Sequence, residues 1–283
     1  MRREELEGLL LAGLATTLFS TGAILVRLAS ALSPLEVTAY RLILGALFVR
    51  ALAYLVRSKV ALTVKELQRL FPIGLVAGLH FLFFIASLYW TTIAHSLTLT
   101  YTAPVFVTLL SRSLLQEPLK RIKYTGIAGA ILGTAVLAGF EPRWSQRMLV
   151  GDLLALGSAL CFGLYSVLGR RERSNFHLLQ YAFWVYLSAG LSLLPFALAT
   201  FSRVHPPKAL LAVFLLALFP LALGHTLYNA ALRRMHASYV NIIATQEVTG
   251  GILLGWLLLD EVPGPTSLLG AGITLAGIIL VLL

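Results

Sequence analysis

The fold follows from residues 70–115, which read LFPIGLVAGLHFLFFIASLYWTTIAHSLTLTYTAPVFVTLLSRSLL. This stretch contains two apolar runs, 70–92 and 94–116, with almost no chain between them. A run of roughly twenty apolar residues can cross the hydrocarbon core of a bilayer as a helix. Because that core offers no water to unpaired backbone groups, we expect both runs to be transmembrane helices.

The same pattern continues in both directions along the chain. It predicts ten transmembrane helices, at 8–30, 34–57, 70–92, 94–116, 122–140, 149–170, 176–200, 207–231, 236–259 and 265–283. Of the 283 residues, 58% are hydrophobic and 12% are charged, whereas an average globular domain is about 25% charged. We therefore expect an all-α integral membrane protein with no soluble domain large enough to hold an active site.

Basic residues concentrate in one set of alternate loops. The richer set contains Arg2, Arg3, Arg57, Lys59, Lys65, Arg69, Lys120, Arg121, Lys123, Arg170, Arg171, Arg173, Arg233 and Arg234. The other set contains Arg143, Arg147, Arg203 and Lys208. The positive-inside rule then predicts a multi-pass protein of the plasma (inner) membrane with both termini in the cytoplasm. Since orientation explains the net charge of +10, we expect no nucleic-acid partner.

The two halves of the chain repeat each other. A glutamate and two glycines recur 144 residues later, as the pairs Glu117/Glu261, Gly126/Gly270 and Gly133/Gly277. We expect a first five-helix repeat over 1–145 and a second over 146–283. Because five is an odd number of crossings, the second repeat enters the membrane from the opposite side. Inverted repeats of this kind allow one central site to face each side of the membrane in turn, which is alternating access.

Short motifs identify a family. They are Ala103-Pro104-Val105-Phe106, LQEPL at 115–119, Gln246-Glu247-Val248 and LDE at 259–261. Over essentially its whole length the chain resembles the EamA-type members of the drug/metabolite transporter superfamily. The resemblance implies a transporter of small organic metabolites, often exported, with amino acids and drug-like amphiphiles among the cargoes. One departure is Val248, where family members often have proline, so a kink in this helix would have to come from Gly250-Gly251.

Glu247 is the most unusual residue in the chain because it falls near the middle of the 236–259 run. An ionised carboxylate at that depth costs at least a few kcal/mol unless it is paired or wet. We favour proton coupling or binding of a cationic substrate group over a buried acid that only fixes a neighbouring helix. His80 lies at a similar depth and is a second coupling candidate, although a neutral imidazole bonded between helices is an equal alternative.

Further polar residues are predicted to bind substrate beside Glu247 and His80. They are Thr98, Tyr101, Tyr165, His225, Tyr228 and Asn229. Pro104 falls among three of them in the middle of a run, where it removes a backbone hydrogen bond and breaks the helix. Interrupted helices at matching depths in two halves indicate a midplane transport site. For Arg41, at the outer half of its helix, attraction of an anion and structural pairing are equally plausible.

Three pairs of glycines are spaced four residues apart: Gly74/Gly78, Gly129/Gly133 and Gly251/Gly255. This spacing lets helix backbones approach closely. We expect these pairs to form packing faces, either between helices of one chain or between two copies in a homodimer.

Two other functions compete with metabolite transport. A lipid or lipid-linked sugar flippase would have a lateral opening to the bilayer lined by apolar residues. A membrane-embedded enzyme would need a catalytic or metal constellation, and the sequence has no HExxH or Gly-x-Ser-x-Gly motif. The single cysteine, Cys161, also excludes a metal site built on several thiolates. We therefore expect no enzyme and no metal or other cofactor, with a small-molecule substrate and membrane lipids as partners.

Overall fold

The computed structural model describes residues 3–91, 93–116, 120–138, 145–172, 175–259 and 265–282. Within these ranges the chain is almost entirely helical and contains no strand. The motif glutamates Glu117 and Glu261 lie outside the described residues.

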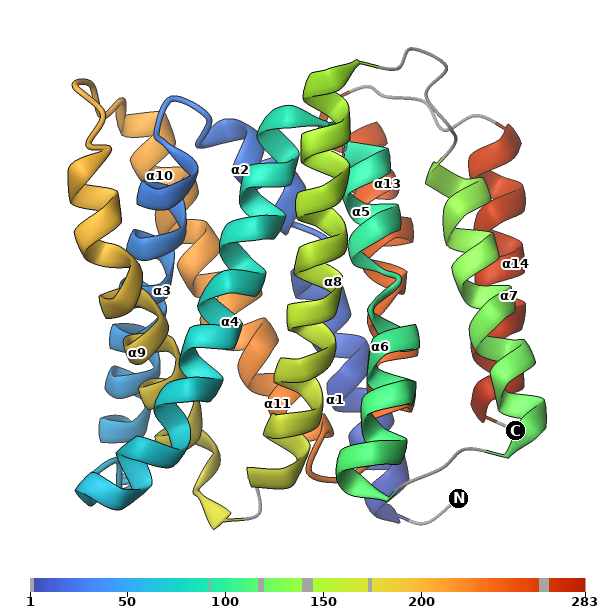
Figure 1. The fold of residues 1–283 in the computed structure, drawn as a ribbon, viewed down its shortest axis with the longest axis horizontal. Coiled ribbons are helices and arrows are strands. Elements are labelled where there is room, and N and C mark those ends of the chain that lie inside the picture. Colours follow the sequence, from blue (N-terminus) through green and yellow to red (C-terminus); the bar gives the residue numbers. More distant parts are fainter. Residues whose placement is uncertain are drawn as a thin grey trace.

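The helices stand side by side as a bundle, and the start of the first and the end of the last lie at the same end of it (Figure 1). In chain order they are α1 (Arg3–Phe19), α2 (Gly22–Leu28), α3 (Pro34–Leu55), α4 (Val64–Trp90), α5 (Ile93–Thr100), α6 (Ala103–Leu110), a π-helical segment (Ser111–Leu115), α7 (Arg121–Ala138), α8 (Gln146–Glu172), α9 (Leu178–Ala199), α10 (Pro207–Leu216), a second π-helical segment (Ala217–His225), α11 (Thr226–Ala231), α12 (Ala237–Ala244), α13 (Gln246–Leu259) and α14 (Pro265–Leu282).

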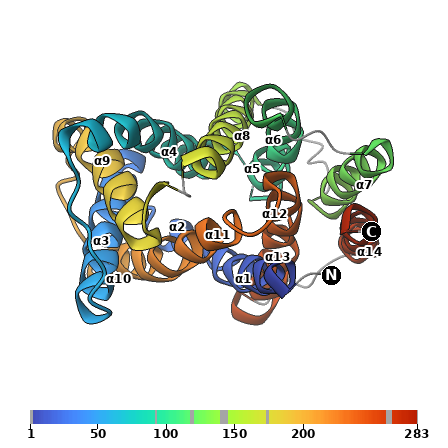
Figure 2. The same ribbon diagram turned by 90° about the horizontal axis from the view of Figure 1, so that it is seen from below.

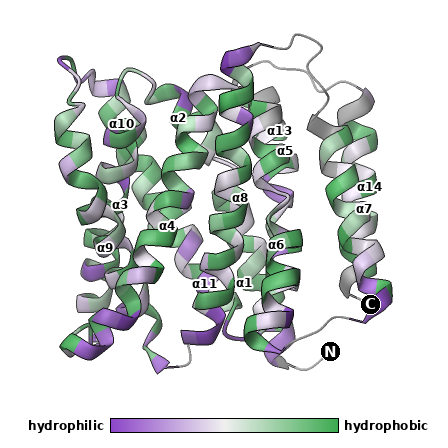
Figure 3. Ribbon diagram, viewed as in Figure 1, coloured by the Kyte–Doolittle hydropathy of each residue, from purple (hydrophilic) through white to green (hydrophobic). Residues whose placement is uncertain are grey.

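Among the described residues, six helical stretches are long and apolar enough to cross a membrane. They are Glu4–Leu28, Pro34–Leu55, Val64–Trp90, Gln146–Glu172, Leu178–Ala199 and Pro207–Ala231, and shorter apolar helices cover Ala103–Leu115 and Leu268–Leu280. Apolar residues run along the length of the helices, whereas many hydrophilic residues lie at their ends (Figure 3). The protein is therefore a multi-pass membrane protein. The count of ten crossings and the inversion of the second half remain predictions.

Several helices are interrupted near the middle of the bundle. Ser20-Thr21 separates α1 from α2, Tyr101-Thr102 separates α5 from α6, and Thr245 separates α12 from α13. Pro104 stands in the first turn of α6, where its missing N–H costs nothing. Each interruption leaves backbone groups and polar side chains inside the bundle.

The helix break predicted at Gly250-Gly251 is not there, because α13 continues through both glycines. Val248, unlike proline, keeps its N–H and donates it to the Thr245 carbonyl at 3.2 Å. Gly250 instead makes room for α1, since a Cβ at this position would collide with the Ser20 hydroxyl. Gly250 therefore serves close packing against α1, and α13 is not broken at either glycine.

Two of the glycine pairs are used for packing within the chain. A Cβ on Gly74 would lie 2.7 Å from Cβ of Ser188 on α9, and one on Gly78 would lie 3.3 Å from Cβ of Ala189. Gly129 and Gly133 face α14 in the same way. A homodimer would have to use other surfaces of these helices.

α7 and α14 pack against each other at one edge of the bundle, and α3 and α9 pack at the other (Figure 2). The α7–α14 contact is reciprocal. A Cβ on Gly133 would meet the Thr274 nitrogen and the Gly270 carbonyl, and a Cβ on Gly277 would meet the Ala130 nitrogen and the Gly126 carbonyl. Each residue of the first set is 144 positions from its counterpart in the second. Corresponding residues of the two halves thus make the same contact.

We expect Gly133→Leu to destabilise the protein by about 1–3 kcal/mol or more, the usual cost of overpacking. The added side chain meets backbone atoms of α14, which cannot rotate aside. Unfolding in detergent can be followed with a thiol-reactive dye, because Cys161 is the only cysteine and is half-buried. Gly272→Leu on α14 is the control, since a Cβ there meets nothing within 4 Å. Equal stability of the two variants would contradict the close α7–α14 packing.

Candidate functional site

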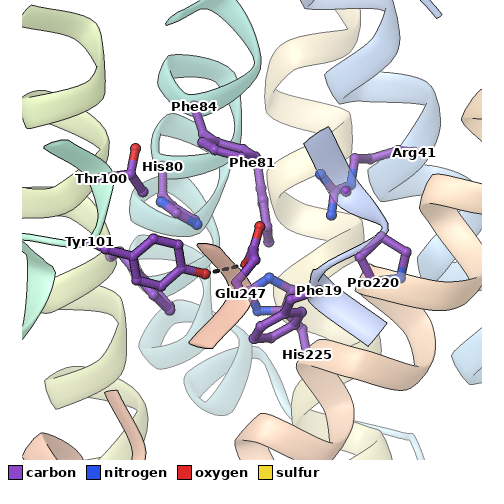
Figure 4. Close-up of a pocket in the computed structure, with 12 residues that line it drawn as sticks. Phe19, Arg41, His80, Phe81, Phe84, Thr100, Tyr101, Pro220, His225 and Glu247 are labelled. Atoms are coloured by element: carbon purple, nitrogen blue, oxygen red, sulfur yellow. Dashed lines mark hydrogen bonds between the residues drawn. The ribbon is translucent and has the colours of Figure 1, made fainter. Parts of the chain in front are cut away.

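A small cavity lies where the interrupted helices meet (Figure 4). Its polar lining is Arg41, His80, Thr100, Tyr101, His225 and Glu247. Its aromatic lining is Phe19, Phe81, Phe84 and Phe162, and Gly22 and Pro220 complete it. The free space is about 30 Å³, room for roughly two or three water molecules. Sites for organic ligands usually measure about 300–1,000 Å³, so the cavity must expand to admit one.

Glu247 and Tyr101 meet in this cavity and are only 8% and 3% exposed. Glu247 lies in the first turn of α13, where the helix dipole favours negative charge. Tyr101 lies in the interruption between α5 and α6, and its hydroxyl donates a hydrogen bond to Glu247 Oε2 (Figure 4). This bond connects a residue of the first half of the chain to one of the second half. Among the described residues, Glu247 is the only one with a carboxyl group that lines the cavity.

His80 reaches the cavity from α4 and is also tied to α8. Its Nδ1 lies 2.9 Å from Ser158 Oγ, and Ser158 Oγ donates to the His80 carbonyl at 3.1 Å. The imidazole stacks on Phe162, with ring centroids 4.6 Å apart. Nδ1 of the imidazole thus forms a hydrogen bond to α8, as expected for an imidazole bonded between helices. The same ring also lines the cavity.

His225 lines the cavity from the end of the second π-helical segment, with its ring 4.4 Å from that of Phe19. π-Helical turns are rare and occur frequently at functional sites. Pro220 lies inside this segment and also lines the cavity.

Tyr165, Tyr228 and Asn229 do not line the cavity but form a polar network beside it. The Tyr165 hydroxyl donates to Asn229 Oδ1 at 2.9 Å. The Tyr228 hydroxyl lies 2.6 Å from Ser166 Oγ and accepts a bond from Asn241 Nδ2 at 2.6 Å. The network ties α8, α11 and α12 together next to Phe162, whose ring lies 5.4 Å from Tyr228.

Thr98 lies on α5, but its side chain is outside the part of the chain that the structure describes. Thr100 lines the cavity, and its buried hydroxyl has no hydrogen-bond partner among the described residues. An unsatisfied buried hydroxyl is uncommon. In a cavity of this kind it provides a free donor and acceptor for water or a ligand.

Arg41 is the main cavity residue that sequence reasoning left undecided. It extends from α3, is 3% exposed, and places its guanidinium 4.7 Å above the centre of the Phe81 ring. Its Nε has no hydrogen-bond partner in the described part of the chain. The signal in the sequence was an arginine too deep in an apolar run to reach either surface.

Two further observations bear on the alternative functions. Among the described residues, we find no group of three or more histidine, cysteine, aspartate or glutamate side chains that could hold a metal ion. A second hollow of about 540 Å³ lies against α1 and α13. Its exposed lining surface is mostly apolar and comes from residues such as Leu18, Phe219, Ile243, Leu253 and Leu254, while threonines, Ser20 and Gln246 add polar groups.

Comparison with known proteins gives one consistent result. The profile of the EamA-like transporter family matches residues 6–139 and again 149–283. The chain is 26% identical over 267 residues to the pseudopaline exporter CntI of Pseudomonas aeruginosa (strain UCBPP-PA14), covering 93% of this chain and 91% of the relative. It is 23% identical over 250 residues to the transporter YoaV of Bacillus subtilis (strain 168), with 87% and 86% covered.

Two other similarities are informative. A probable terminal-alkyne amino-acid exporter of Streptantibioticus cattleyicolor is 28% identical over 184 residues, which cover 63% of this chain and 60% of the relative. A solved crystal structure superposes with a TM-score of 0.84 at 19% identity, covering 96% of this chain and 95% of that one. At 19% identity, this similarity is evidence for the fold only.

Proposed function

Because the chain belongs to the EamA-like transporter family, we propose that it exports small organic metabolites, such as amino acids or related amphiphilic compounds, across the plasma membrane by alternating access. The observation that carries the proposal is the buried Glu247–Tyr101 pair in a cavity between interrupted helices of both halves. Two relatives are named as exporters, one of pseudopaline and one of a terminal-alkyne amino acid.

The internal symmetry of the molecule supports alternating access. The family profile matches two successive stretches, and corresponding glycines of the two halves make reciprocal contacts between α7 and α14. Two halves related in this way can exchange conformations, so that one site is exposed first to one side and then to the other.

Two arginines, Arg27 and Arg170, each bond a backbone carbonyl of another segment near one end of the bundle. Arg27 Nη2 donates to the Thr91 carbonyl at 3.4 Å, and Arg170 Nη1 donates to the Leu232 carbonyl at 2.8 Å. The start of α5 and the end of α11, next to these carbonyls, lie at opposite ends of the bundle (Figure 1). With both contacts made and a cavity of only about 30 Å³, the structure fits a closed state between the two open ones.

Glu247, assisted by His80, is the group that we propose to couple transport to protons. A carboxyl at this depth is stable when it holds a proton or faces a cation, and unstable when it is charged and alone. A proton and a cationic substrate group can therefore replace each other on Glu247 as the cavity opens to either side. This exchange would use the inward flow of protons to drive export.

The proposal is tested by efflux from liposomes. Purified protein is reconstituted into vesicles loaded with a metabolite mixture, and efflux is followed by mass spectrometry with and without a pH gradient. We expect selective, protein-dependent loss of a few small compounds, faster with the gradient. Absence of any protein-dependent loss would contradict metabolite transport.

A flippase for lipids or lipid-linked sugars is the second candidate, and the mostly apolar hollow against α1 and α13 favours it. A hollow of about 540 Å³ beside exposed leucines could hold an acyl chain. Fluorescent lipid in the same vesicles discriminates between the candidates. Protein-dependent lipid exchange between leaflets without metabolite efflux would place the flippase first.

A further inference from the structure

Arg41 and Glu247 both line the cavity. One is a base and the other an acid, so their side chains are of opposite charge type. No salt bridge joins them among the contacts of the described residues, and Figure 4 shows the guanidinium and the carboxyl facing the same space from different helices. Burial of a charge is costly unless a partner compensates it.

Each charge has bonding capacity that the protein leaves open. Glu247 accepts a hydrogen bond on Oε2 from Tyr101, and no hydrogen bond is made to Oε1 among the described residues. Arg41 is supported by the face of the Phe81 ring but makes no hydrogen bond to any described residue, and its Nε is buried without a partner. A guanidinium carries five N–H donors in a planar fork that fits a carboxylate.

The combination of charges selects against simple ions. An anion attracted by Arg41 would be repelled by Glu247, and a cation attracted by Glu247 would be repelled by Arg41. A molecule that carries both charges meets favourable partners at both ends. Phe19, Phe84 and Phe162 form an aromatic part of the remaining lining and would contact an apolar substituent.

We infer that the ligand of this cavity is a small zwitterion with an apolar side chain, whose carboxylate binds Arg41 and whose ammonium binds Glu247. The inference rests on the proposed transport function and specifies its substrate class. Arg41 is then a specificity-determining residue, and Glu247 binds the substrate ammonium in the same place where it holds a proton.

The test uses three amino acids of different size: L-alanine, L-leucine and L-phenylalanine. Each is offered as the free zwitterion, as the methyl ester, which lacks the carboxylate, and as the N-acetyl derivative, which lacks the ammonium. Efflux from proteoliposomes is corrected for leakage from protein-free liposomes. For at least one of the three, we expect the zwitterion to move at least tenfold faster than either derivative.

The variants assign each charge to its residue. In Arg41→Gln, efflux of the zwitterion should fall to the rate of its ester, and in Glu247→Gln it should fall to the rate of its N-acetyl derivative. Arg41→Lys, which keeps the charge, should retain part of the preference for the zwitterion and covers the case in which Arg41→Gln does not fold. Arg50→Gln, at an exposed arginine on the same helix, is the matched control and should behave as wild type.

The failures of the two proposals are distinguishable. If the protein moves components of the metabolite mixture but none of the zwitterions, or moves zwitterion and derivatives alike, the inference is wrong and the transport function stands. If Arg41→Gln and Arg41→Lys both keep the wild-type preference, the assignment to Arg41 is also wrong. If nothing moves, the transport function itself fails.

Discussion

Replacement of Glu247 by glutamine is expected to abolish the pH-gradient dependence of efflux and to slow efflux roughly 10- to 100-fold. Glutamine keeps the size of the side chain and can still accept the Tyr101 hydroxyl bond, but it can neither hold a transferable proton nor attract an ammonium group. The magnitude follows because a hydrogen bond to a charged group is worth about 1.5–3 kcal/mol, and about 1.4 kcal/mol corresponds to a tenfold change.

The measurement is initial efflux from proteoliposomes with and without a pH gradient, for wild type and variant at equal protein density. Glu4→Gln, at an exposed glutamate in the first turn of α1, changes the same side chain away from the cavity and should have no effect. Gradient-driven efflux that survives unchanged in Glu247→Gln would remove Glu247 from the coupling mechanism.

Loss of the arginine contacts at the two ends of the bundle is expected to have opposite effects on the sidedness of the cavity. Arg170→Gln should open the end near α11, and Arg27→Gln should open the end near α5. Each removes a charged donor from a backbone carbonyl that holds two segments together. We expect about a tenfold shift for Arg170, whose bond is shorter, and a smaller one for Arg27, since charged hydrogen bonds are worth about 1.5–3 kcal/mol.

This shift can be measured as the rate at which an impermeant thiol reagent labels a cysteine placed in the cavity. Thr100→Cys in a Cys161→Ser background provides that cysteine with little change in size. Arg121→Gln, at an exposed arginine that begins α7, is the control. If both arginine variants raise labelling from the same side, the two contacts are not equivalent gates.

The all-helical, multi-pass membrane character could be predicted from the sequence, but the partners within the site could not. Hydropathy alone indicated the helical spans, and the depth of Glu247 in an apolar run marked it as a candidate. Depth does not determine which face of a helix points inward. Thr100 lines the cavity although the sequence did not single it out, and Thr98 remains a prediction because its side chain lies outside the described part of the chain.

The state of Arg41 shows the same limitation. The sequence left open whether Arg41 attracts an anion or pairs with a neighbouring side chain. Its contact with the Phe81 ring depends on how α3 is rotated and where α4 places Phe81, and the sequence specifies neither. Tyr165, Tyr228 and Asn229 were predicted to bind substrate, and the structure places them in a polar network beside the cavity lining. Their hydrogen bonds to one another and to neighbouring helices depend on tertiary packing that a single sequence does not specify.

The breaks in the helices were only partly predictable. Proline at position 104 indicated an interruption next to Tyr101, because proline favours the first turn of a helix. The interruption at Thr245 has no proline or glycine to mark it, and the two glycines at 250 and 251 suggested a break a few residues too late. Glycine permits both bending of a helix and close packing of two helices. At Gly250 the close approach of Ser20 indicates packing.

The central claim is that the cavity around Glu247 opens to each side of the membrane in turn. It is tested most directly by labelling Thr100→Cys, in the Cys161→Ser background, with an impermeant maleimide added from one side or the other of oriented vesicles. The account predicts labelling from both sides at different rates, and protection from both sides by a transported compound. A cysteine that reacts from one side only, whatever compound is present, would contradict it.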